Sequence, residues 1–241
     1  MVVTKKKDQH KTELPENQNK KNSTLTVEDV IRCIQEQSSE ERKKAQAYFK
    51  IVDVNNFGLT MPQIRILAKE AGKNHQRAIA LWKTGVHEAR HVAMMTVDLK
   101  QFTEAQADKW LKDFNSWDIV DGCCSAVLCR MPFAYEKAIE WTKQKGEYQK
   151  RAGFALMAML AVHDKKASDE KFTAFYPYLL KESHDDRNFV KKAINWAIRQ
   201  IGKRNHTLKK EMIELCLAIR EKGDTASKWI AADAIRELAS K

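Results

Sequence analysis

The sequence predicts an all-α protein, and three observations support this fold class. Apolar residues recur with a helical period from Thr26 onward, and no convincing alternating strand pattern interrupts them. The 241 residues include only 8 glycines and 4 prolines, which favours helices joined by short polar links. The hydrophobic share of 43% and the charged share of 31% are typical of a soluble globular chain with a real core.

The chain divides into a tail and one domain. Residues 1–25 are polar, carry six lysines and lack the apolar segment of a signal peptide, so we expect a disordered basic tail. Residues 26–241 form the expected domain. No run approaches the ~18 apolar residues that a membrane span requires.

Capping signals mark the first helices of the domain. Thr26 and Asp29 have the spacing of a capping box, and residues 40–51 are predicted to form the second helix. Thr60 caps the third helix, where Pro62 is tolerated in the first turn. Later helices are predicted at 75–83, 86–100, 103–113, 117–130, 132–144, 147–163, 168–181, 186–203, 206–222 and 225–239.

A weak internal repeat suggests how these helices are arranged. Small and apolar helix starts recur roughly 30 to 41 residues apart, and a more charged helix precedes each of them. Helix pairs at this period are typical of HEAT-like solenoids, although an irregular helical bundle gives a similar pattern. We predict a curved solenoid with a concave basic face. The net charge of +11 indicates a polyanionic partner, either nucleic acid or an acidic surface.

The cysteines and histidines give no sign of a disulfide framework or a metal centre. The five cysteines form no Cys-x-x-Cys pair, and their odd number argues against a disulfide framework. They are interpreted as reduced and mostly buried. No zinc-ligand spacing is apparent, so neither a metal nor a cofactor is expected.

One stretch, Asn115–Gly122, combines an aromatic ring with two carboxylates in eight residues. In a helix, Trp117 and Asp121 lie four residues apart and share a face, while Asp118 points elsewhere. Asp118 in the first turn suits the positive end of the helix dipole. Asp121 lies one turn further along, beside a tryptophan and an apolar run, and is harder to explain as a solubility residue.

Two further groups have chemistry that complements this carboxylate. Trp196 and Arg199 are three residues apart and share a helix face. Arg151 lies near the start of an apolar helix, where its charge opposes the dipole, so an acidic partner or a bound phosphate is expected. Each residue alone has an ordinary explanation in packing, capping or a surface ion pair. Together, two rings and a carboxylate suit a developing cation, and two arginines suit phosphates.

These residues resemble the motifs of the AlkD-type bacterial DNA alkylation-repair glycosylases, which are all-helical HEAT-like proteins. Residues 117–121 look like the family's Trp-Asp-x-Val-Asp motif, in which the second Asp is catalytic. Residues 149–152 are similar to its Gln-Arg-Ala motif, and residues 192–199 to its Lys-Ala-Ile-x-Trp-x-x-Arg motif. Residues 56–65 and 81–90 resemble two segments near its N-terminus.

The resemblance implies a role for each site residue. Asp121 would be the catalytic carboxylate, and Trp117 and Trp196 would contact the deoxyribose of the lesion. Arg151 and Arg199 would hold the DNA backbone near the damaged nucleotide. The further DNA contacts would be Tyr48, Lys150 and Lys192. The chain departs from the family at Ser116, where the family can carry another tryptophan, and in a longer segment between Arg151 and Trp196.

The implied function is a monofunctional DNA glycosylase of base excision repair that hydrolyses the N-glycosidic bond of N3- or N7-alkylated purines. Its partner would be double-stranded DNA with alkylated bases. The protein would be a monomer, bacterial, cytoplasmic and associated with the nucleoid, and would not bind membranes. Two alternatives stay open at this point: a non-catalytic binder of distorted or branched DNA, and a HEAT-like scaffold for protein interactions.

Overall fold

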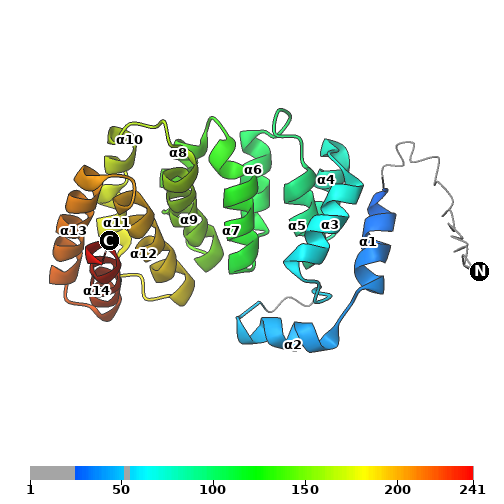
Figure 1. The fold of residues 1–241 in the computed structure, drawn as a ribbon, viewed down its shortest axis with the longest axis horizontal. Coiled ribbons are helices and arrows are strands. Elements are labelled where there is room, and N and C mark those ends of the chain that lie inside the picture. Colours follow the sequence, from blue (N-terminus) through cyan, green and yellow to red (C-terminus); the bar gives the residue numbers. More distant parts are fainter. Residues whose placement is uncertain (1–24, 52–54, 241) are drawn as a thin grey trace, which may run out of the picture.

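The computed structural model describes residues 25–51 and 55–240, and within them the chain is helical with no β-strand (Figure 1). The predicted all-α fold class is therefore confirmed. Apart from Leu25, the expected tail lies outside the described residues. The described helices include none that is long and apolar enough to cross a membrane.

The helices follow one another along the whole chain. They are α1 (Val27–Glu36), α2 (Glu40–Tyr48), α3 (Met61–Ala71), α4 (His75–Lys83), α5 (His87–Thr96), α6 (Glu104–Lys112), α7 (Trp117–Ala126), the 3₁₀ helix η1 (Leu128–Arg130), α8 (Ala134–Trp141), α9 (Glu147–His163), α10 (Glu170–Thr173), α11 (Tyr176–Glu182), α12 (Asn188–Gly202), α13 (His206–Glu221) and α14 (Thr225–Ala239).

The predicted capping signals form the expected bonds. Thr26 and Asp29 make a complete capping box at the start of α1, with each side chain bonded to the other residue's backbone. Thr60 and Gln63 make another at α3, whose first turn contains a proline. These local bonds satisfy amide groups that a helix start leaves without partners, so the sequence can specify these helix starts locally.

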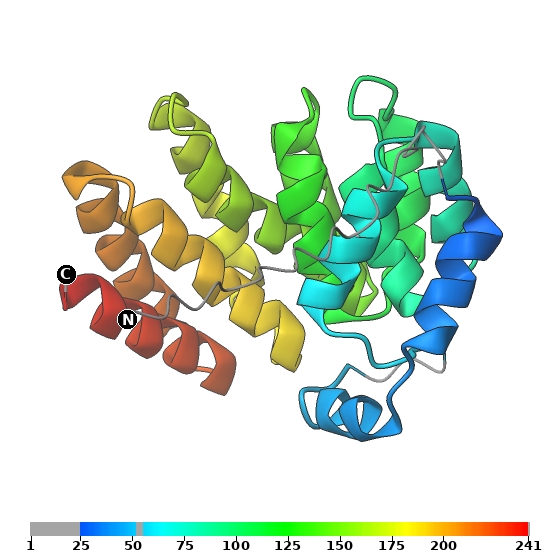
Figure 2. The same cartoon turned by 45° about the vertical axis from the view of Figure 1, so that its right-hand side comes forward.

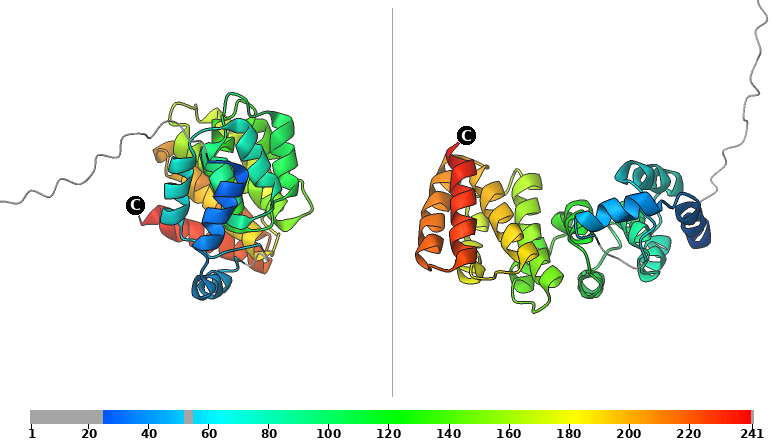
Figure 3. Two further views of the ribbon diagram at one scale, coloured as in Figure 1. Left: turned by 90° about the vertical axis from the view of Figure 1, so that its right-hand side faces the viewer. Right: turned by 90° about the horizontal axis from the view of Figure 1, so that it is seen from below.

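The helices form a row of neighbouring pairs that runs from α1 to α14 (Figure 1). Helix α5 packs against α3, α4 and α7, and α9 packs against α7, α8 and α12. Helix α12 in turn packs against α13 and α14. Helix α2 has no buried residue and projects from this row, as Figures 2 and 3 show. The curvature and the concave basic face stay predictions.

The core is densest around α9. Every residue from Arg151 to Ala161 is buried, which fits a helix covered on all sides by its neighbours. Gly153 lets α8 approach closely, because a Cβ atom there would lie 2.7 Å from the Thr142 nitrogen and 2.8 Å from the Ala138 oxygen.

Several predicted helices end early, and one divides. The helices predicted at 86–100 and 132–144 end at Thr96 and Trp141. The helix predicted at 40–51 ends at Tyr48, and Lys50 takes a left-handed conformation with φ of 63°. The helix predicted at 117–130 stops at Ala126 and is followed by η1. The helix predicted at 168–181 is two short helices, and a proline in the first turn of α11 explains the break, since proline lacks the amide hydrogen that a continuous helix requires.

Candidate nucleic-acid site

A pocket of about 620 Å³ opens between the end of α2 and helices α7, α9, α12 and α14. It gathers every site residue predicted from the sequence except Lys150. Its lining residues are Tyr48, Phe49, Lys50, Trp117, Asp121, Arg151, Asn188, Phe189, Lys192, Asn195, Trp196, Arg199, Trp229 and Asp233. Residues separated by up to 185 positions in the sequence therefore meet in one cavity.

Helix α7 presents Trp117 and Asp121 to the pocket on one face, as their spacing predicted. The indole nitrogen of Trp117 donates a hydrogen bond of 2.9 Å to the carbonyl oxygen of Phe49. This bond joins α7 to the residue that follows α2. It thereby fixes both the tryptophan and the aromatic edge of the pocket.

Asp121 is held by Arg151 through two hydrogen bonds. The Nε and Nη2 atoms of Arg151 donate to the two carboxylate oxygens at 3.0 and 2.7 Å, and its Nη1 donates to the Phe189 carbonyl oxygen at 2.7 Å. Burial raises the pKa of Asp121, and the Arg151 charge only partly offsets this effect. The acidic partner expected for Arg151 is thus Asp121. The contact between Arg151 and DNA phosphate stays a prediction, since these three nitrogens already have partners within the protein.

Helix α12 lines the opposite side of the pocket with Lys192, Trp196 and Arg199, which are spaced to share one helix face. Lys192 is exposed and Trp196 is half-buried. Arg199 forms an ion pair with Glu237 of α14. Hydrogen bonds from Lys203 and Arg199 lower the pKa of Glu237 to about 2, so this carboxylate is ionised at neutral pH.

Lys150 lies outside the pocket. Its ammonium group contacts Glu182 at 2.7 Å and Asp185 at 3.2 Å. Lys150 precedes Arg151 in α9, and one residue of helix rotation directs it to another face. The structure therefore does not bring Lys150 to the other predicted DNA contacts.

The sequence analysis missed several lining residues. Phe49 is 62% exposed and Trp229 is 38% exposed, and both place aromatic rings at the pocket. The Lys191 ammonium lies 5.7 Å from the centre of the Trp229 ring. The sequence feature that could have indicated Phe49 is the Tyr48-Phe49 pair at the end of a charged helix. Adjacent exposed aromatic rings are common in nucleic-acid and protein interfaces.

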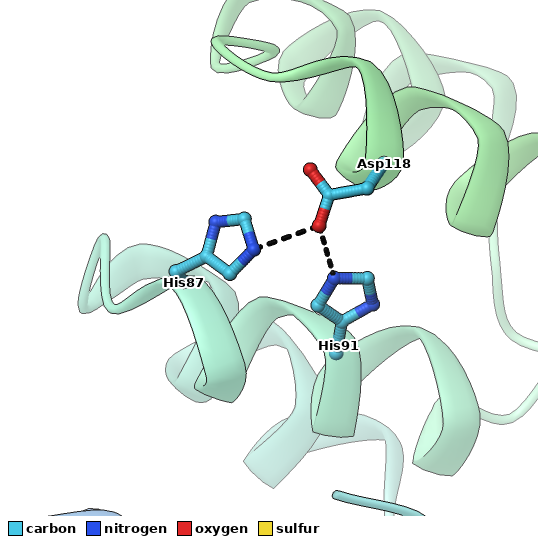
Figure 4. Close-up of side chains that lie close together, drawn as sticks. All are labelled: His87, His91 and Asp118. Carbon is cyan, nitrogen blue, oxygen red and sulfur yellow. Dashed lines mark hydrogen bonds and ion pairs between the residues drawn. The ribbon is translucent and has the colours of Figure 1, made fainter. Parts of the chain in front are cut away.

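A second cluster lies beside the pocket, where Asp118 faces His87 and His91 of α5 (Figure 4). The Nε2 atoms of the two histidines lie 2.8 and 3.1 Å from one oxygen of Asp118, and the Ser116 hydroxyl donates to the other oxygen. Burial alone would raise the pKa of Asp118, but hydrogen bonds from the two histidines hold it well below its ordinary value. Asp118 lies in the first turn of α7, as its suitability for the helix dipole predicted, and it also binds these histidines.

The family model described as "DNA alkylation repair enzyme" matches residues 33–238. This chain belongs to that family. A solved structure described as "A new family of proteins related to the HEAT-like repeat DNA glycosylases with affinity for branched DNA structures" matches with a TM-score of 0.72 at 19% identity. The match covers 88% of this chain and 95% of the other, and at this identity it shows the HEAT-like fold. No curated protein matches.

Proposed function

We propose that this family member is a monofunctional DNA glycosylase that releases N3- or N7-alkylated purines from duplex DNA. One observation supports this most directly: the carboxylate of Asp121 lines the same pocket as Trp117 and Trp196. A carboxyl group with a pKa raised by burial, set in a cavity among aromatic rings, is typical of a functional site.

The chemistry that fits this group of residues is the departure of a base that is already cationic. An N3- or N7-alkylated purine leaves without protonation, and the sugar develops oxocarbenium character as the bond breaks. Asp121 in its ionised form would stabilise that charge and orient the attacking water. The faces of Trp117 and Trp196 would add cation–π attraction and exclude solvent. The two bonds from Arg151 would hold the carboxylate in one orientation.

Contacts with the DNA backbone would come from cations at the pocket that are not bonded to Asp121. Lys50 and Lys192 are exposed lining residues. Arg199 also lines the pocket, and it shares its partner Glu237 with Lys203. Exposed Tyr48 and Phe49 offer rings for stacking against a sugar or an unstacked base. The surplus of positive charge over the whole chain would strengthen these contacts.

A second function, non-catalytic binding of branched DNA, is favoured by a different observation. Both oxygens of Asp121 accept hydrogen bonds from Arg151, and such a partly buried ion pair can have a purely structural role. The similar solved structure is described as having affinity for branched DNA. In this case the pocket would bind an unpaired nucleotide at a junction and break no bond.

Single-turnover release of 7-methylguanine from methylated duplex DNA separates the two functions. We expect the wild-type protein to release the base without cleaving the strand, and Asp121→Asn to reduce the rate by ~10²–10³ while DNA binding persists. The matched control is Asp233→Asn, because Asp233 lines the same pocket and pairs with the exposed Arg236. Asp118→Asn is not used as the control, because Asp118 belongs to the histidine cluster.

Binding to duplex and four-way-junction DNA is measured in parallel. Tight junction binding by a wild-type protein that releases no base would favour the branched-DNA function. Equal loss of release in Asp121→Asn and Asp233→Asn would mean that the pocket's overall charge matters and Asp121 has no specific role.

A further inference from the structure

The sequence of α5 begins His87-Glu88-Ala89-Arg90-His91, which has the His-Glu-x-x-His spacing of many zinc sites. The two histidines lie one helical turn apart and their rings face the same side (Figure 4). They are only 2% and 3% exposed. This pair corrects the expectation that the sequence holds no zinc-ligand spacing.

Asp118 of α7 supplies a third ligand atom at the same place. The ligand atoms of His87, His91 and Asp118 all lie within 4.8 Å of one another. Zinc bonds to nitrogen and oxygen of about 2.0–2.1 Å in tetrahedral geometry separate neighbouring ligand atoms by roughly 3.3 Å. The two observed nitrogen–oxygen distances of 2.8 and 3.1 Å need only small side-chain shifts to reach that value.

The surroundings of the cluster also suit a cation. One carboxylate oxygen of Asp118 faces the Nε2 atoms of both histidines, so a cation between them would meet one oxygen and two nitrogen ligands. The Ser116 hydroxyl on its other oxygen fixes the orientation of the carboxylate, as outer partners of metal ligands do. The Asp118 side chain is 17% exposed, which leaves a path for an ion and a water molecule as the fourth ligand.

We propose that His87, His91 and Asp118 form a binding site for a transition-metal dication of the Zn²⁺ class. Each imidazole would bind the ion through Nε2 and carry its ring hydrogen on Nδ1. The Nδ1 atom of His91 is buried without a hydrogen-bond partner. An unpaired N–H group there costs far less than the binding of a structural zinc ion contributes.

Glu88 indicates that this metal would be structural and not hydrolytic. In metalloproteases with the same spacing, this glutamate is the general base. Here Glu88 is fully buried, and its carboxylate accepts hydrogen bonds from the backbone amides of Phe57, Gly58 and Leu59. It is therefore committed to the loop before α3. The metal would join α5 to the first turn of α7, one turn before Asp121.

Metal binding by the full-length, metal-free protein tests this proposal in the absence of DNA. We expect equilibrium dialysis with Zn²⁺ to give one tightly bound ion per chain, and Co²⁺ to show the visible absorption of a tetrahedral nitrogen–oxygen site. Added Zn²⁺ should also raise the thermal unfolding midpoint. Because no base release is measured, failure here leaves the glycosylase proposal untouched.

Two conservative variants distinguish a metal site from a cluster held only by hydrogen bonds. His91→Gln places an amide N–H where Nε2 lies and keeps a bond to Asp118, whereas Asp118→Asn keeps the size of the side chain. Each variant should weaken Zn²⁺ binding by about 100-fold or more and abolish the rise in unfolding midpoint. The exposed His184 provides the matched control, and His184→Gln should bind like wild type.

The proposal is overturned if the wild-type protein binds no ion or if His91→Gln binds as tightly as wild type. Thiolate absorption in the Co²⁺ spectrum would equally overturn it, because it would assign the ion to cysteines.

Discussion

Asp118 and Asp121 lie three residues apart in one helix, and their surroundings shift their carboxyl pKa values in opposite directions. Burial raises the pKa of Asp121, and the charge of Arg151 offsets this only in part. The pKa of Asp118 is low because two histidines form hydrogen bonds with its carboxylate. Paired carboxyl groups with separated pKa values are a common way for one site to assign different roles to similar residues. Asp118 stays charged and anchors the helix, while Asp121 titrates at a higher pH.

The raised pKa of Asp121 predicts the acid limb of the pH profile for base release. The proposed mechanism needs the ionised carboxylate, so activity should fall as pH drops through the folded-state pKa of Asp121, above the ordinary value of 3.8. The measurement is the single-turnover rate for 7-methylguanine against pH, with the Asp121→Asn background subtracted. An acid limb at or below pH 3.8 would contradict the assignment.

The Asp121–Arg151 pair predicts a stability effect from a single change. Arg151 is 6% exposed and the Asp121 side chain is 22% exposed, so Arg151→Met would leave a partly buried carboxylate without its partner. We expect a loss of about 1–3 kcal/mol in the free energy of unfolding, measured by urea denaturation. The double variant Asp121→Asn/Arg151→Met should recover part of that loss. Arg199→Met is the comparison, and it should cost about 1 kcal/mol or less, because Arg199 and Glu237 are each 26% exposed.

At the scale of elements, α2 is the helix least integrated into the stack. It has no buried residue, and the hydrogen bond from Trp117 to the Phe49 carbonyl ties its end to α7. Gln46 adds a bond to the Leu59 carbonyl oxygen. A helix with so little burial contributes little to the core, so its aromatic end is available for binding.

Truncation of this aromatic end should weaken DNA binding and leave stability unchanged. Tyr48 and Phe49 are 82% and 62% exposed, so their replacement by alanine removes no core packing. Base stacking on an aromatic ring contributes ~1–3 kcal/mol, so each variant should lose about fivefold or more in affinity. Fluorescence anisotropy with labelled duplex measures binding, and thermal unfolding checks the fold. Ile66→Ala, at a 60% exposed residue outside the pocket, should change neither.

The sequence was sufficient for those elements whose causes are local. The capping box predicted at Thr26, the cap predicted at Thr60 and the predicted bounds 75–83, 147–163 and 225–239 match the structure. The broken helix at α10 and α11 was predictable from Pro177, because a proline within a helical pattern ends or kinks the helix.

The site depended on tertiary neighbours that helical periodicity does not specify. Arg151 and Lys150 are adjacent and both basic, yet α9 directs one to Asp121 and the other to Glu182 and Asp185. Which face meets the pocket depends on where α7 and α11 lie around α9. Likewise, the helical spacing places Asp118 and Asp121 near each other on α7 but does not indicate that histidines of α5 lie opposite Asp118.

At the scale of the whole molecule, the pocket depends on the complete stack, because its walls come from α2 near the start and α14 at the end. The net charge of +11 is spread over the chain, while the pocket holds four cations and two carboxylates among its lining residues. If DNA lies across this pocket, the local cations must displace condensed counterions from its phosphates.

The affinity for duplex DNA should therefore fall steeply as salt rises, and a pocket cation should account for a measurable part of the slope. Each phosphate neutralised contributes about 0.9 to the slope of log affinity against log salt, so Lys192→Ala should lower the slope by about one. Lys150→Ala is the matched control, because its ammonium contacts Glu182 and Asp185 away from the pocket and should leave the slope unchanged. Affinity is measured by anisotropy at several salt concentrations. A flat response to salt would remove the electrostatic basis of the DNA site, and an equal change in both variants would place the DNA elsewhere on the solenoid.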